Sequence, residues 1–136
     1  MITYVFDPSL SPALVLSLRV LIPEKGEKPV VVEHDVCHAS DVVCAPGEFL
    51  ATIARKDDIL VTCLTPARRR VVMAEIVALG LRSVHLVDAF SGLNIFEQAG
   101  RLISAWTRVV KDSYRLKKAH GISVRLDGHT TLMPPR

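Results

Sequence analysis

The chain has 136 residues, nearly half of them apolar, and a formal net charge of +3 at pH 7. This length lets one domain bury roughly two thirds of the surface that its unfolded form exposes, so the fold needs no disulfide or metal for support. No stretch of about 18 residues lacks a charge or a proline, which argues against a membrane-spanning helix. Residues 1–8 also lack the basic leader and long apolar core of a signal peptide, so we expect a cytoplasmic protein.

Three cysteines, Cys37, Cys44 and Cys63, form an odd set, and we expect reduced thiols rather than a disulfide framework. Cys37 and Cys44 lie near His34 and His38, but the spacing matches no common zinc pattern, so no metal site is predicted. Thiol catalysis at Cys37, with His34 or His38 as the base, stays open on residue type alone. The single asparagine and single glutamine are a depletion associated with thermophiles.

Hydrophobic periodicity and capping residues divide the chain into alternating strands and helices. In chain order they predict strand 2–6, helix 12–22, strand 29–33, helix 48–54, strand 59–64, helix 66–79, strand 82–88, helix 94–118 and strand 122–126. The segment 34–47 is the least clear, although Val42 and Val43 suit a short strand. We expect a single domain at 1–127, followed by an irregular tail at 128–136.

The strands at 59–64 and 82–88 are nearly continuous apolar runs, which are typical of strands buried on both faces of a parallel sheet. The helix at 66–79 supplies the crossover that parallel strands need. The whole pattern predicts a doubly wound, Rossmann-like or flavodoxin-like three-layer sandwich, with a mostly parallel sheet of about five strands and a long C-terminal helix. Strand 122–126 alternates apolar and polar residues, which suits an edge strand.

Polar side chains gather where the predicted strands end, and ligands of open parallel sheets bind beyond those carboxyl ends. The residues expected to bind a ligand there are Ser9, His34, Thr65, Arg68, Asp88, Ser91 and Gly92. Arg68 lies in the first turn of a helix with Arg69 and Arg70, where positive charge opposes the helix dipole and favours an anionic partner. The sequence has no glycine-rich NAD or P-loop motif. We therefore expect a binding or regulatory module for a small anionic ligand, such as a nucleotide, although helix capping explains the serines and the threonine equally well.

Two other functions stay open, and one of them makes the chain an enzyme. Asp7, Asp35 and Asp88 each follow a predicted parallel strand and would meet around one divalent cation, as in a metal-dependent phosphoesterase or nuclease. His34 would then join the carboxylates in acid–base work. The third function is nucleic-acid binding by the helix at 94–118.

The helix at 94–118 has two contrasting faces. Its apolar stripe overshoots the predicted sheet and would form a homodimer interface; it includes Trp106, Val109, Val110 and Tyr114. Residues 101–118 carry six bases and one acid, a net charge of +5. The basic stripe on the opposite face would follow a nucleic-acid backbone or be a solvated surface; it consists of Arg101, Arg108, Lys111, Arg115 and Lys118.

Overall fold

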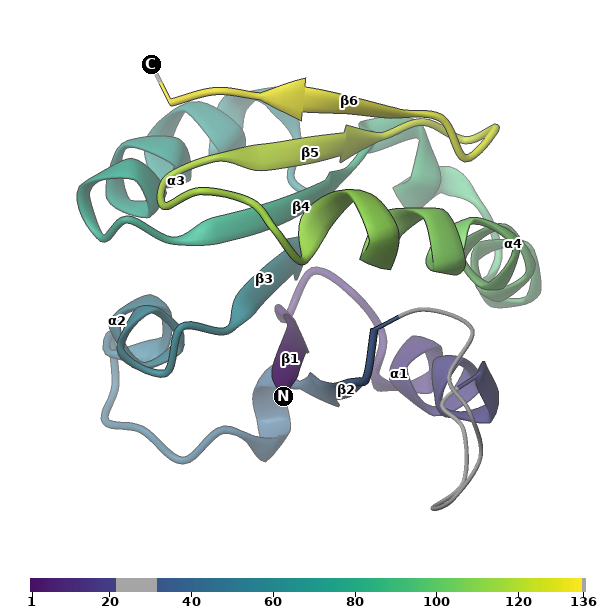
Figure 1. Ribbon diagram of the computed structural model, residues 1–136. Coiled ribbons are helices and arrows are strands. Elements are labelled where there is room, and N and C mark those ends of the chain that lie inside the picture. Colours follow the sequence, from purple (N-terminus) through teal and green to yellow (C-terminus); the bar gives the residue numbers. More distant parts are fainter. Residues whose placement is uncertain (22–31, 136) are drawn as a thin grey trace.

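The computed structural model describes residues 1–21 and 32–135, which form an α/β structure around one six-stranded, mostly parallel sheet (Figure 1). The strands are β1 (Ile2–Phe6), β2 (His34–His38), β3 (Ile59–Thr62), β4 (Arg82–Leu86), β5 (Gly121–Val124) and β6 (Thr130–Met133). Their order in the sheet is β2-β1-β3-β4-β5-β6. The first five strands are parallel, and β6 is antiparallel to β5.

Four α-helices cover the sheet in the described parts of the chain: α1 (Pro12–Leu18), α2 (Phe49–Arg55), α3 (Pro66–Ala78) and α4 (Ile95–Ser113). Three of them begin at a capping residue, where the side chains of Ser11, Thr65 and Asn94 accept a hydrogen bond from a backbone N–H two or three residues later. The helices α1 and α4 pack together on one face of the sheet, whereas α2 and α3 pack on the other (Figure 1). None of the described helices is long and apolar enough to cross a membrane.

The core between α4 and the sheet is built around three aromatic rings. Trp106 lies 5.1 Å from the ring centroid of Tyr4 and 5.8 Å from that of Phe6, and only 1% of its surface is exposed. Val109 and Val110 are completely buried beside it. These three residues of the apolar stripe therefore pack inside their own chain, because α4 lies along the sheet, whereas Tyr114 is half-buried after the end of the helix.

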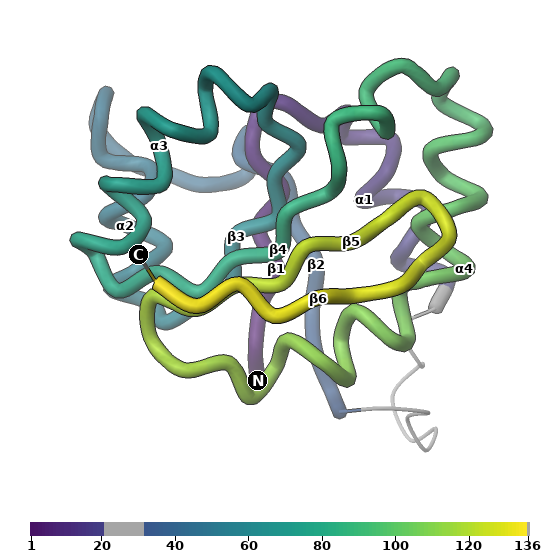
Figure 2. The backbone as a smooth tube through the Cα atoms, turned by 90° about the horizontal axis from the view of Figure 1, so that it is seen from above, coloured from purple at the N-terminus to yellow at the C-terminus, as the bar shows by residue number. Residues whose placement is uncertain are grey.

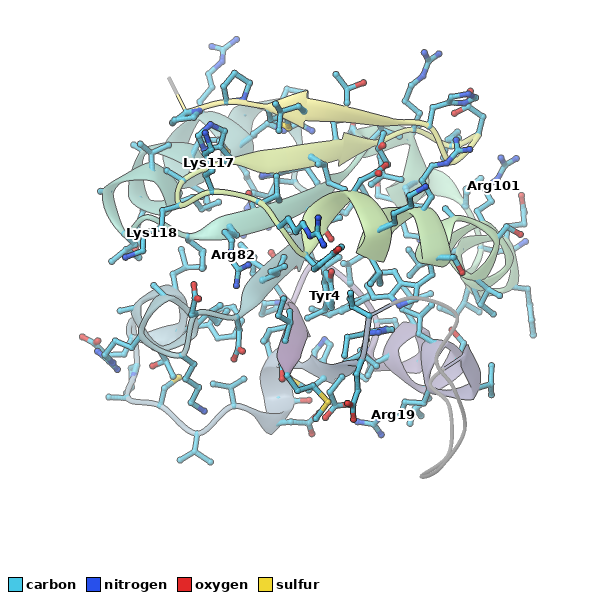
Figure 3. The ribbon with its side chains drawn as sticks, in the orientation of Figure 1. Tyr4, Arg19, Arg82, Arg101, Lys117 and Lys118 are labelled. Carbon is cyan, nitrogen blue, oxygen red and sulfur yellow. The ribbon has the colours of Figure 1, made fainter. Side chains whose placement is uncertain are left out.

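The helix α4 is shorter than the sequence predicted, since it ends at Ser113 instead of residue 118. After it the chain turns back toward the sheet: Leu116 packs against the core, and Ala119 adopts a positive φ of 65° just before β5 begins. Arg115 and Lys118 consequently lie outside the helix. In Figure 3, Arg101 lies beside the turn between β5 and β6, whereas Lys118 lies at the opposite end of the molecule. The predicted basic stripe is thus divided into two parts.

The second strand lies later in the sequence than predicted. Residues 29–31 of the expected strand fall outside the described residues, and the observed strand is β2, within the segment that had no clear prediction. It is an edge strand that buries His34, Val36 and His38 on one face and leaves Asp35 exposed. The strand pattern of β2 is difficult to recognise in the sequence, because His34 and His38 occupy buried positions where apolar residues are usual. Val42 and Val43, the other suggested strand, belong to no strand in the structure.

The C-terminal tail is not wholly irregular, because β6 forms within it and pairs with β5. The sheet consequently has six strands rather than about five, and its outer strand on this side is β6 instead of β5 (Figure 2). The strand was missed because the sequence TTLM is short and only its register with β5 gives it partners. Thr130 Oγ1 also donates a 2.6 Å hydrogen bond to Asp112 Oδ2 on α4, which fixes the hairpin to the helix.

Candidate functional site

The carboxyl ends of β1 and β3 are joined by a hydrogen-bond network around Asp7. Its Oδ1 accepts a hydrogen bond from the backbone N–H of Ser9 at 2.9 Å and another from the Ser9 hydroxyl, and its Oδ2 accepts one from Thr62 Oγ1. The Ser9 hydroxyl oxygen in turn accepts the backbone N–H of Cys63 at 3.0 Å. Asp7 therefore connects two strands, and much of its hydrogen-bonding capacity is used inside the fold.

The other residues expected at this edge lie on neighbouring connections. Thr65 caps α3, Arg68 is exposed in the first turn of that helix, and Asp88 begins a short 3-10 helix after β4. Ser91 and Gly92 lie in that same short helix, where the Ser91 hydroxyl donates to the carbonyl of Asp88 at 2.7 Å. Thr65 therefore caps α3, as the sequence predicted.

His34 and Asp35 lie at the wrong end of the sheet for a shared site with Asp7. The register pairs Ile2 with His34 and Phe6 with His38, so His34 is at the amino end of β2, about 16 Å from the level of Asp7 if each residue advances about 3.3 Å. His34 Nε2 accepts a 3.0 Å hydrogen bond from Trp106 Nε1, and its Nδ1 is 3.1 Å from the carbonyl of Val32. It is a buried core histidine. The structure consequently does not bring the three predicted aspartates together.

Cys37 cannot use either neighbouring histidine as a base, because alternate residues of β2 point to opposite faces. His34 and His38 point toward the α1–α4 side, whereas Cys37 packs on the α2 side. Burial and the nearby carboxylates of Asp41 and Asp58 raise the pKa of the Cys37 thiol. Burial and the carboxylates of Asp88 and Asp7 likewise raise the pKa of the Cys63 thiol, so neither is an activated nucleophile.

Metal-binding side chains are dispersed in this structure. Within residues 1–21 and 32–135, no three histidine, cysteine, aspartate or glutamate side chains lie close enough to hold one ion. The separation of Asp35 from Asp7 is one cause, and the internal bonding of Asp7 is another.

A row of polar side chains crosses the α3 side of the sheet, and it was not foreseen from the sequence. Thr62, His85, Ser123 and Thr131 are successive partners across β3, β4, β5 and β6, and we call these four residues the polar row. Exposure increases along the row, since Thr62 and His85 are buried, Ser123 is half-buried and Thr131 is exposed. The row thus leads from the core toward the uncovered part of the sheet beside α3.

His85 is held in a tight environment in this row. Its Nε2 lies 2.8 Å from the hydroxyl of Ser83, and its Nδ1 is buried with no hydrogen-bond partner among the described residues. Burial, reinforced by the positive charge of Arg69, lowers the pKa of His85 to about 4. A Cβ at Gly121 would lie 2.7 Å from the Ser83 hydroxyl, so glycine there leaves the room that the serine and histidine occupy.

A groove of about 600 Å³ runs between α3 and β6, beside this row. We call it the α3–β6 groove; its lining includes Arg69, Arg70, Met73, Val77, Leu132 and Met133. The two arginines lie toward the N-terminus of α3, and the apolar side chains occupy the rest. Arg69 Nε is buried and has no hydrogen-bond partner in the described parts of the chain. Arg69 and Arg70, rather than the predicted Arg68, therefore line a cavity, and Arg69 is the more buried of the two.

Periodicity within α3 could have identified Arg69. It lies four residues before Met73 and seven before Ile76, on the stripe that faces the sheet, whereas Arg68 lies outside that stripe. His85 gave a weaker signal, as a lone polar ring in an apolar strand. Nothing local marked Ser123 or Thr131, because they join the row only through strand pairing.

Comparison of the chain with known protein families, with characterised proteins and with solved structures finds no match. Function is therefore inferred from the geometry described above.

Proposed function

We propose that this chain is a doubly wound, flavodoxin-like α/β domain that binds a small anionic, nucleotide-like ligand. The parallel strands follow the order β2-β1-β3-β4-β5, which reverses direction between β1 and β3. Sheets of this kind bind ligands beyond the carboxyl ends of their strands, close to such a reversal. The N-terminus of α3 follows β3 at this edge, and the α3–β6 groove extends from it along the helix to the opposite edge, where Met133 pairs with Gly121 at the start of β5.

The observation that carries the proposal is the buried Nε of Arg69, which has no partner among the described residues. A phosphate or carboxylate oxygen in the groove would accept a hydrogen bond from the guanidinium of Arg69, which lines the groove. Arg68 and Arg70 add positive charge in the same turn, and no carboxylate lies within 4.0 Å of any of the three in the part of the chain that the structure describes. An anion at this position would also interact favourably with the dipole of α3.

The rest of the groove favours a ligand with an apolar body. Met73 and Val77 on α3 lie across the groove from Met133 on β6, and methionine side chains adapt well to flat rings. The volume of about 600 Å³ falls within the usual range of small-molecule sites, about 300–1,000 Å³. A nucleotide combines an anionic group with a flat ring system and matches both ends of the groove.

Methionine methyl NMR tests this directly, because the chain has three methionines and two of them line the groove. Protein labelled with ¹³C on the methionine methyl groups is titrated with adenosine 5′-monophosphate, with adenosine and with inorganic phosphate. We expect the monophosphate to shift the signals of Met73 and Met133 but not that of Met1, which is 82% exposed outside the groove. Each half of the nucleotide alone should need at least about tenfold higher concentration.

Two arginine variants supply the matched comparison. Arg69→Gln should weaken the binding of adenosine 5′-monophosphate on the order of tenfold or more, as loss of a charged hydrogen bond does. Arg68→Gln removes the same charge one residue away, outside the groove lining, and should change binding only a little. Equal effects of the two variants, or no movement of the Met73 and Met133 signals, would refute the proposal.

A further inference from the structure

A second groove lies on the opposite face of the molecule, between α4 and the turn that joins β5 to β6. We call it the α4–hairpin groove, and its volume is about 720 Å³. Arg101, Arg108 and Lys111 line its helical side, and Gly128 lies on the turn. These three cations are the residues of the predicted basic stripe that lie within α4.

The three cations of this groove form no ion pair within the described structure. No carboxylate lies within 4.0 Å of Arg101, Arg108 or Lys111 in residues 1–21 and 32–135. Asp112 follows Arg108 by four residues, a spacing that favours an ion pair, yet its carboxylate accepts the hydroxyl of Thr130 instead.

The second acid of the groove is also engaged elsewhere. Asp127 Oδ1 accepts the backbone N–H of His129 at 3.0 Å and lies 3.1 Å from His129 Nδ1. Arg101 keeps most of its guanidinium free, since only Nη1 is used, in a 3.0 Å hydrogen bond to the carbonyl of Leu126. The groove therefore presents three cations without an ion-pair partner among the described residues, beside two carboxylates that are hydrogen-bonded elsewhere, and its lining keeps an excess of positive charge.

The spacing of these cations favours a polymer over a small anion. Arg101 and Lys111 are ten residues apart on one helix, or about 15 Å at 1.5 Å per residue. A single phosphate group cannot reach both, whereas a nucleic-acid strand places one charge about every 3.4 Å of its axis in a duplex. Between the cations, the groove is lined by Gly100, Ser104 and Thr107, which leave room for a backbone and offer hydroxyl donors.

From these features we infer that the α4–hairpin groove binds the phosphate backbone of a nucleic-acid duplex. Arginine, lysine and small hydroxyl side chains are the usual donors to phosphate oxygens. The groove lining holds no aromatic side chain from the described residues on which an unpaired base could stack, so the contact follows the backbone and reads no sequence. This site is separate from the α3–β6 groove, and the two are tested by different residues.

Fluorescence anisotropy with a labelled 20-base-pair DNA duplex, repeated over a series of salt concentrations, tests the inference. Three phosphate contacts predict a slope of log affinity against log salt of about −2.7. Arg108→Ala and Lys111→Ala should each bring the slope about one closer to zero and weaken binding several-fold at low salt. Both residues are exposed on a helix, where alanine is well tolerated, and circular dichroism checks that each variant folds.

The matched control is Arg55→Ala, which removes one positive charge from α2 on the opposite face of the sheet. It should leave the slope unchanged. Three results would overturn the inference: no binding at low salt, equal weakening by Arg55→Ala and Arg108→Ala, or equally tight binding of poly-glutamate, which would assign the groove to an acidic protein segment instead.

Discussion

Burial and charge act in the same direction at His85. Its ring is 1% exposed, one ring nitrogen contacts Ser83, and the positive charge of Arg69 disfavours protonation further. The neutral ring is therefore the form that the fold accommodates. Arg69 links this core residue to the α3–β6 groove, because the same guanidinium lines that groove and contributes to the pKa of His85.

The lowered pKa of His85 predicts a specific loss of stability in acid. The unfolded chain binds a proton near the ordinary pKa of 6.5, whereas the folded chain does so only near pH 4. Stability present above pH 6.5 is consequently lost as the pH falls from 6.5 to about 4, by roughly 3 kcal/mol in total. Urea unfolding across this range measures it. In the His85→Gln variant, the free energy of unfolding should change less between pH 6.5 and 4. The control His129→Gln, at an exposed position, should show the same pH dependence as the unmodified protein. Identical pH dependence in all three proteins would contradict the role of His85.

Two glycines predict opposite effects of the same substitution. A methyl group at Gly121 would meet the Ser83 hydroxyl at 2.7 Å and its backbone oxygen at 2.9 Å, so Gly121→Ala should destabilise the fold by about 1–3 kcal/mol. Gly100 lies inside α4, where a methyl group would have no neighbour within 4 Å among the described residues, so Gly100→Ala should stabilise by about 1 kcal/mol. Chemical denaturation of both variants checks the pair. A stable Gly121→Ala protein would show that the Ser83–His85 pair is not closely packed.

At the scale of elements, α4 contributes one face to the core and the other to a groove. Its buried face carries Trp106, whose ring N–H bonds to His34, and Ser113, whose hydroxyl lies 2.7 Å from the Tyr4 hydroxyl. Burial raises the pKa of Tyr4 to about 12, because an ionised phenolate would lose its hydration there. The sheet thus holds α4 through two buried polar contacts as well as through apolar packing.

Trp106→Glu distinguishes a core role of the apolar stripe from an interface role. A carboxylate at this fully enclosed position would lose its hydration and leave His34 without its donor, so we expect loss of the folded state. Circular dichroism and sedimentation velocity on both proteins measure the outcome. A well-folded Trp106→Glu monomer derived from a dimeric parent would instead restore the idea of a dimer through this stripe.

At the scale of the whole molecule, the two helical layers leave two parts of the surface concave. No helix follows β5 in the described chain, so the outer strands β5 and β6 are not covered by α3, and the α3–β6 groove forms on that side. On the other face, the turn that joins β5 to β6 lies beside α4, and the second groove forms between them. One groove combines arginines with apolar side chains, and the other combines cations with small polar ones, which is why different ligands are proposed for them.

The sequence by itself determined the α/β class, the first, third, fourth and fifth strands to within a few residues, and the starts of three helices. These features depend on local periodicity and on capping residues such as Ser11, Thr65 and Asn94, whose partners lie within a turn. It also identified the first turn of α3 as a cationic segment. Short-range interactions suffice for all of this.

Only the tertiary structure decided where the functional groups meet. Strand β2 begins at His34 rather than ending before it, which moves Asp35 away from Asp7, and β6 appears only because β5 offers it partners. The polar row and the buried guanidinium of Arg69 likewise depend on register and on helix placement. Residues far apart in the chain share these features, and a one-residue change of register would turn each side chain to the other face of the sheet.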